Sequence, residues 1–279
     1  MITYRAMLDV HDGLVLFLSR LLAAERRYRG TPARSRKLTP RRQAVMALRW
    51  FRDRTRIEAL GRDHGISRAT AYRYVAEAVD VLSAQAPGLA GALERAMADG
   101  VPYVILDGKV FPTDRCAETV TSVKGEQVHA WYSGKAHRPG ANVQAVMRPD
   151  GLPLWTSPAE PGSVTDLPAA RVHALPALYR AAARGMPTLA DAGYQGAGIG
   201  IHLPVKNQPG NKQEPHVDIR TRNALLRSLR YSGERGFALL TQRWAALQRI
   251  TASPSRTTEI TRAALVLTHW EHKYLQQIL

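Results

Sequence analysis

Residues 103–108 read YVILDG, an apolar run of four residues that ends directly in Asp107 and Gly108. Such a run before an acidic residue is typical of a buried strand with a polar side chain at its carboxyl end. A second short strand, Thr188–Ala190, ends in Asp191 in the same way. Because strand ends of an α/β sheet project side chains into a shared cleft, both aspartates are candidate functional residues.

The sequence around these strands alternates between strand and helix patterns. Further strands are expected at His129–Tyr132, Val143–Met147, Leu152–Thr156 and Ile201–Val205, and helices at Asp166–Arg180, Ile219–Leu229, Glu234–Arg249 and Thr258–Lys273. Asp150-Gly151 is a hairpin turn pattern. This order predicts an α/β fold with a mixed sheet and flanking helices.

The first hundred residues contain only helical patterns. Thr39-Pro40 is an N-cap followed by a first-turn proline, and a last helix over Leu89–Ala98 ends at Gly100. We therefore expect an all-helical domain at residues 1–100 and the mixed-sheet domain at residues 101–279.

Residues 57–75 have the pattern of a helix-turn-helix. A helix over Arg56–His64 is followed by the turn Gly65-Ile66-Ser67, where Ser67 caps a second helix. The candidate DNA-contacting residues near the start of that helix are Ser67, Arg68, Thr70 and Arg73. In such motifs this end enters the major groove, where arginine reads guanine or holds phosphate. The alternative is a plain helical hairpin in a core.

Charge is the unusual feature of the composition. Lys and Arg number 39 against 23 Asp and Glu, a formal net charge of +16. Twelve basic residues lie between Arg26 and Arg56, opposed within that stretch by Asp53 alone. Such a surface attracts polyanions, with nucleic acid as the first candidate and an anionic membrane as the second. The alternative interpretation is a solvated helix face.

Cysteine content and hydropathy exclude several classes of protein. The single cysteine, Cys116, excludes a disulfide framework and a cysteine-rich zinc site. No apolar run approaches the ~18 residues of a membrane span, and the first residues do not read as a signal peptide. We expect a cytoplasmic protein without a membrane partner.

A third acid, Glu234, lies 43 residues beyond Asp191 on an expected helix. Two strand-end aspartates and a glutamate from a neighbouring helix can hold one or two Mg²⁺ ions, which prefer oxygen ligands. Two such ions stabilise the attacking and leaving oxygens of a displacement at phosphorus. For each aspartate alone, a turn or capping role is the alternative.

Several segments occur in the order found in a known family: residues 105–108 (ILDG), 132–135 (YSGK), 161–166 (PGSVTD), 189–196 (LADAGYQG) and 230–235 (RYSGER). With them, the chain from about residue 38 to its end resembles the DDE transposases of the IS5-type insertion-sequence family, which carry an N-terminal helix-turn-helix. The resemblance implies a ribonuclease-H-like catalytic domain with Asp107, Asp191 and Glu234 as metal ligands. It implies Mg²⁺, with Mn²⁺ as a substitute, and double-stranded DNA as the partner. It also implies cutting at terminal inverted repeats, joining to target DNA, and a homodimer or larger assembly on DNA.

The chain departs from the family pattern around its third acid. Glu234 lies between Gly233 and Gly236, which weaken a helix, and the basic residue expected after it is represented by Arg243. Glu214 and Asp218 are the substitutes for Glu234.

Other residues of these segments have two interpretations. Lys135 and Arg138 hold DNA phosphates or form a solvated turn. Asp166 shapes the wall of the active site or, as we favour, caps a helix. Tyr194 stacks on a flipped base or, as we favour, packs in the core. A second basic stretch, a candidate DNA track, consists of Lys206, Lys212, Arg220, Arg222, Arg227 and Arg230. The competing functions are an inactive or regulatory helix-turn-helix DNA-binding protein and a nuclease on the same fold.

Overall fold

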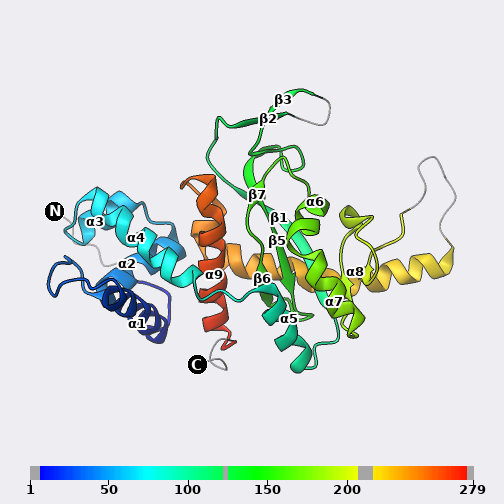
Figure 1. Ribbon diagram of the computed structural model, residues 1–279, viewed down its shortest axis with the longest axis horizontal. Coiled ribbons are helices and arrows are strands. Elements are labelled where there is room, and N and C mark those ends of the chain that lie inside the picture. The colour runs from blue at the N-terminus through cyan, green and yellow to red at the C-terminus, as the bar shows by residue number, and fades with distance from the viewer. Residues whose placement is uncertain (1–6, 122–124, 207–215, 275–279) are drawn as a thin grey trace. The chain divides into compact units, whose positions relative to one another are not determined.

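The computed structural model describes residues 7–121, 125–206 and 216–274 (Figure 1). Its contacts divide the chain into two compact units. Unit 1 comprises Met1–Ala86, Leu240–Gln248 and Glu259–Leu279, and unit 2 comprises Pro87–Leu239 and Arg249–Thr258. The division differs from the boundary near Gly100, because α5 (Leu89–Ala98) packs on the sheet of unit 2. The separate functions of the two domains stay a prediction.

Unit 1 is helical. Its elements are α1 (Asp12–Tyr28), α2 (Pro40–Asp53), α3 (Ile57–Asp63), α4 (Arg68–Ser83), η2 (Ala245–Gln248) and most of α9 (Thr257–Glu271). The predicted caps are present, since Thr39 Oγ1 accepts a hydrogen bond from Arg42 N and Ser67 Oγ accepts one from Thr70 N. Ile66, in the turn between α3 and α4, packs against a core that includes Leu60 and Val75.

The C-terminal segments complete unit 1. Trp244 is fully buried, its ring centroid lies 6.5 Å from that of Phe51, and its Nε1 donates a hydrogen bond to Thr268 Oγ1 at 2.9 Å. Arg243 forms ion pairs with Asp9 (2.7 Å) and Glu271 (2.6 Å). Arg243 therefore has a structural role within unit 1.

Unit 2 contains the mixed sheet, in the order β4-β5-β1-β8-β9, with β6 and β7 also paired to β5. The strands are β1 (Val104–Pro112), β4 (Tyr132–Ser133), β5 (Arg138–Met147), β6 (Pro153–Thr156), β7 (Glu160–Pro161), β8 (Thr188–Leu189) and β9 (Ile201–His202). β1 is antiparallel to β5 and parallel to β8. A separate hairpin consists of β2 (Thr119–Thr121) and β3 (Gln127–His129). The mixed α/β fold with flanking helices is confirmed.

The single helix predicted over Asp166–Arg180 is wrong. The structure has α6 (Asp166–His173) and α7 (Leu175–Ala183), separated at Ala174, whose φ of −122° is not helical. Pro176 follows at the start of α7, where it has no backbone N–H to give to the preceding turn.

The break predicted between two helices near residues 230–233 is also wrong. A single helix, α8, runs from Val217 to Arg243 (Figure 1). A Cβ at Gly233 would lie 2.9 Å from Ile105 Cγ2, and one at Gly236 would lie 2.4 Å from Met147 Sδ. The two glycines therefore let α8 approach the sheet closely, and this packing outweighs their low helix propensity.

Within the described ranges, none of the helices has the length and apolar character needed to cross a membrane.

Candidate active site

The register of β1 and β8 brings two acids together. Ile105 pairs with Leu189 in the parallel ladder, and Asp107 and Asp191 each lie two residues beyond that pair. The negative charge of Asp191 also contributes to raising the pKa of Asp107. The two aspartates are therefore neighbours. The prediction that Asp107 ends its strand is wrong, because β1 continues to Pro112 through its pairing with β5, whereas Asp191 does follow the end of β8.

Asp107 lies in an environment that opposes its ionisation. Burial, with smaller contributions from the charges of Asp191 and Asp166, raises its pKa to about 6. The hydrogen bond from Gly108 N (2.9 Å) and the charge of Arg230 act in the opposite direction. Asp191 accepts a hydrogen bond from Gly193 N at 2.7 Å, as the N-cap of η1 (Ala192–Tyr194). Asp107 is half-buried by its exposed surface, and a partly desolvated carboxylate beside a second carboxylate favours the binding of a cation.

Asp107 lies on the face of β1 that packs against α8. Alternate residues of a strand share a face, so Asp107 shares one with Ile105, Lys109 and Phe111. Ile105 lies against Gly233 of α8, and Lys109 Nζ lies 5.6 Å from the ring centroid of Phe237. Lys109 was missed in the sequence, although its position two residues after Asp107 is the pattern that would have identified it.

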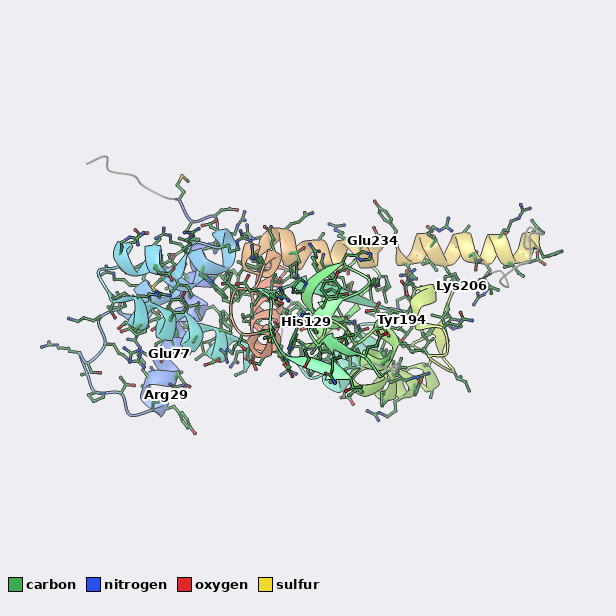
Figure 2. All side chains as sticks on the ribbon, turned by 90° about the horizontal axis from the view of Figure 1, so that it is seen from above. Arg29, Glu77, His129, Tyr194, Lys206 and Glu234 are labelled. Carbon is green, nitrogen blue, oxygen red and sulfur yellow. The ribbon has the colours of Figure 1, made fainter. Side chains whose placement is uncertain are left out.

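Two residues of α8 lie on this side of the helix. Arg230 is half-buried, its charge acts on Asp107, and its Nε is buried without a hydrogen-bond partner among the described residues. Glu234 follows four residues later, one helical turn along the same side. Its side chain is exposed (Figure 2).

The acids only partly meet the requirements of a metal site. In the described parts of the chain, no three His, Cys, Asp or Glu side chains cluster as a metal-binding group. Mg²⁺ is commonly held by one or two carboxylates, with water and substrate phosphates as the other ligands. The adjacent carboxylates of Asp107 and Asp191 fit that requirement, whereas the role of Glu234 as a third ligand stays a prediction.

The two substitutes for Glu234 gain no support. Asp218 is highly exposed and lies 3.2 Å from His216 Nδ1 at the start of α8. Glu214 lies outside the described residues, as does Lys212 of the second basic stretch.

The opposite face of β1 carries a closed polar network. Asp166 Oδ1 accepts hydrogen bonds from Asn142 Nδ2 (3.0 Å) and Gln144 Nε2 (3.4 Å), and Asp166 Oδ2 lies 2.8 Å from Lys135 Nζ. A Cβ at Gly108 would lie 2.4 Å from Asp166 Oδ1, so this position requires glycine. Asp166 is the first residue of α6, but its side chain bonds to β5 rather than capping the helix.

Tyr194 extends this network. It is fully buried, as its prediction as a core residue requires, and its hydroxyl donates a hydrogen bond to Gln144 Oε1 at 2.5 Å. Burial raises its pKa. Asn142 and Gln144 are polar residues two positions apart within an apolar strand, the sequence pattern that could have indicated the network.

A family model described as DDE superfamily endonuclease matches residues 106–269, more than half of the chain. The chain belongs to this family. The matched region begins one residue before Asp107 and includes Asp191 and Glu234. Membership indicates a nuclease or transposase-like enzyme. No curated protein and no solved structure matches the chain significantly.

In this DDE endonuclease, the candidate DNA-contacting residues of unit 1 lie at the start of α4. Ser67, Arg68 and Arg73 are exposed, and Thr70 is half-buried. Arg68 lies 3.2 Å from Glu58, and Arg73 donates a hydrogen bond to Thr70 Oγ1 at 3.2 Å. Their DNA contacts stay a prediction.

The candidate DNA-contacting residues of unit 2 come from separate segments. Lys135 is exposed but bound to Asp166, and Arg138 is exposed at the start of β5. Lys206 is exposed (Figure 2), and α8 holds the preceding residues, since Arg222 donates a hydrogen bond to Leu203 O at 2.8 Å.

The basic block of this DDE endonuclease is less open than its sequence suggests. Five of its arginines form ion pairs with acids from outside the block: Arg29–Glu25, Arg36–Glu77, Arg41–Asp12, Arg49–Asp63 and Arg52–Asp9. The fold therefore balances part of the charge that appears unopposed along the chain.

Proposed function

We propose that this protein is a DNA transposase that binds the ends of an insertion element and catalyses metal-dependent strand cleavage and strand transfer. The observation that carries the proposal is the pair formed by Asp107 and Asp191, which lie side by side on the neighbouring segments β1 and β8 within the region matched by the endonuclease family. We assign the sheet of unit 2 to the ribonuclease-H-like class.

Asp107 and Asp191, with Glu234 as the third acid, would hold Mg²⁺, and we expect two ions and Mn²⁺ as a substitute. When bound, these ions supply electrostatic stabilisation of the attacking and leaving oxygens at phosphorus.

The reaction consists of two displacements. Water attacks a phosphorus atom at the element end, and the bond to the 3′ oxygen breaks to leave a 3′-hydroxyl and a 5′-phosphate. That hydroxyl then attacks a target phosphodiester, and the 3′ oxygen of the target leaves. Lys109 and Arg230 lie beside Asp107 and donate hydrogen bonds to phosphate oxygens, where negative charge increases during each displacement.

DNA binding uses both units. Ser67, Arg68, Thr70 and Arg73 place the start of α4 in a major groove, and Lys135, Arg138, Lys206 and Arg230 contact the backbone near the acids. Because two element ends are processed together, we expect a homodimer or larger assembly on DNA in the cytoplasm.

Plasmid cleavage tests the proposal. A supercoiled plasmid carrying the DNA that flanks the gene is incubated with protein and Mg²⁺, and nicked and joined products are separated on gels. Asp107→Ala and Asp191→Ala should abolish both products while gel-shift binding persists. Asp99→Ala, an exposed aspartate that follows α5, is the matched control. Wild-type cleavage by either variant would sink the assignment.

A second candidate, a regulatory DNA-binding protein without catalysis, is favoured by the lack of a three-acid cluster among the described residues. It predicts that DNA binding occurs and that Mg²⁺ or Mn²⁺ yields no cleavage.

Glu234→Gln, compared with Asp218→Asn on the same helix, addresses the third acid. Loss of cleavage in the first variant alone supports Glu234 as a ligand. Cleavage at the wild-type rate in both variants would show that Glu234 is not a ligand.

A further inference from the structure

A cavity of about 590 Å³ lies in unit 1 between residues 29–37 and α4. Two kinds of anion-binding side chain line it. The cationic side chains are Arg29, Arg36, Lys37 and Arg73, and the hydroxyl side chains are Ser35 and Thr70. Glu77 and Asp80 also contribute to it, and Arg29 and Glu77 are both marked in Figure 2. The formal charge of the lining is positive, with four cations against two carboxylates.

The carboxylate of Glu77 is already satisfied by the protein. Its side chain is 5% exposed, and its oxygens accept hydrogen bonds from Arg36 at 3.0 Å and from Gln43 at 2.8 Å. Among the described residues, Lys37 and Arg73 have no ion pair. The cavity therefore keeps two cations for an anionic ligand, Lys37 and Arg73, against one further carboxylate that could repel it, Asp80.

The backbone that carries Arg36 and Lys37, and the guanidinium of Arg36, are held in place before any ligand binds. The backbone N–H of Lys37 donates a hydrogen bond to Tyr74 Oη at 3.1 Å, and the guanidinium of Arg36 lies 5.5 Å from the centroid of the Tyr74 ring. Both contacts fix residues 36–37 against α4. Such preorganisation lowers the entropic cost of binding.

The cavity adjoins the helix that we propose for DNA recognition. Thr70, Arg73 and Glu77 follow one another at intervals of three and four residues, so they share one side of α4. A duplex with α4 in its major groove presents a sugar–phosphate strand along the side of the helix.

We infer that this cavity binds a phosphodiester of the DNA strand bordering that groove, with Lys37 and Arg73 as its direct contacts and Arg36 as a fixed neighbouring charge. The inference rests on the proposed DNA binding. A volume of about 590 Å³ accommodates a sugar–phosphate unit rather than a lone small ion.

The test is the salt dependence of binding to two unrelated 30-base-pair duplexes, followed by fluorescence anisotropy from low to moderate KCl. In Lys37→Gln, the slope of log K against log[KCl] should fall by about 0.9, the value for one phosphate contact, and both duplexes should weaken by the same factor. Arg20→Gln is the matched control, because it removes one exposed charge on α1 outside the cavity.

An unchanged slope in Lys37→Gln, or a decrease no larger than that of Arg20→Gln, overturns the inference while leaving DNA binding intact. The absence of any salt-dependent binding by the wild-type protein overturns the proposed function itself. Calorimetry with pyrophosphate at matched ionic strength covers the other source of phosphate. Pyrophosphate binding that is lost in Lys37→Gln, with the DNA slope unchanged, would show a site for free phosphate and overturn the assignment to DNA.

Discussion

The two faces of β1 treat their charged residues differently. On the α6 face, the Asp166 carboxylate receives donors from Asn142, Gln144 and Lys135. On the α8 face, the hydrogen bond that the described residues donate to the Asp107 carboxylate comes from the backbone N–H of Gly108. The ammonium group of Lys109 lies over the ring of Phe237 rather than against a carboxylate. Buried charges that the chain itself satisfies stabilise a fold, whereas those it leaves unsatisfied are candidates for binding something else.

After the loss of cleavage expected on replacing Asp107, the largest effect should come from the cation on the α8 face. Lys109→Gln removes a donor that we propose contacts phosphate, and we expect cleavage to fall about 100-fold, the scale of one preorganised donor. Lys109→Arg should restore part of the rate. The cleavage rate is measured under single-turnover conditions, and the Tm of each variant is measured by thermal melting. A slower rate in Lys109→Gln that a lower Tm explains would contradict the assignment.

The next effect is on stability and belongs to the α6 face. Asp166→Ala leaves Asn142 and Gln144 without their shared acceptor, at a cost of about 3 kcal/mol in the free energy of unfolding. Urea denaturation measures it, and the exposed Asp99→Ala should change stability by about 0.5 kcal/mol or less. Equal losses in the two variants would show that the Asp166 network contributes little to folding.

Removing the charge of Asp107 should have the opposite effect on stability. Its folded pKa of about 6 exceeds the ordinary value of 3.8, so its favourable contribution is full below pH 4 and is lost as pH rises through 6. Without metal, Asp107→Asn should therefore raise stability at pH 8 by about 2 kcal/mol and leave it unchanged at pH 4. Thermal melts in chelator at both pH values test this, and no gain at pH 8 would contradict the buried, unsatisfied carboxylate.

The smallest effect concerns how closely α8 approaches the sheet. Gly236→Ala places a Cβ against Met147 and Gly151, and we expect a net loss of about 1 kcal/mol after the gain in helix propensity. Gly91→Ala in α5, where a Cβ meets open space, should instead stabilise by up to about 1 kcal/mol. A gain in both variants would mean that α8 shifts easily away from the sheet.

The sequence predicts those parts of the fold that depend on residues close together along the chain. The caps at Thr39 and Ser67 are local patterns, and they predict the starts of α2 and α4 closely. The apolar run before Asp107 predicts the start of β1 but not its end, because residues 107–112 continue the strand by pairing with β5. The Asp166 network joins residues 22 to 31 positions apart, so no local pattern specifies it. The continuity of α8 was missed for a related reason, because Gly233 and Gly236 are helix-weakening until their contacts with β1 and β5 are known.

The composition of unit 1 from both ends of the chain has a consequence for its synthesis. Phe51 is made early, but its partner Trp244 and the α9 residue Thr268 follow 193 and 217 residues later. Domains generally fold as units during translation. The packing of α2 against the C-terminal segments of unit 1 is therefore completed only after the acids of unit 2 have been made. A prematurely terminated chain would be a poor competitor for element ends, and a fragment of residues 1–100 should fold poorly.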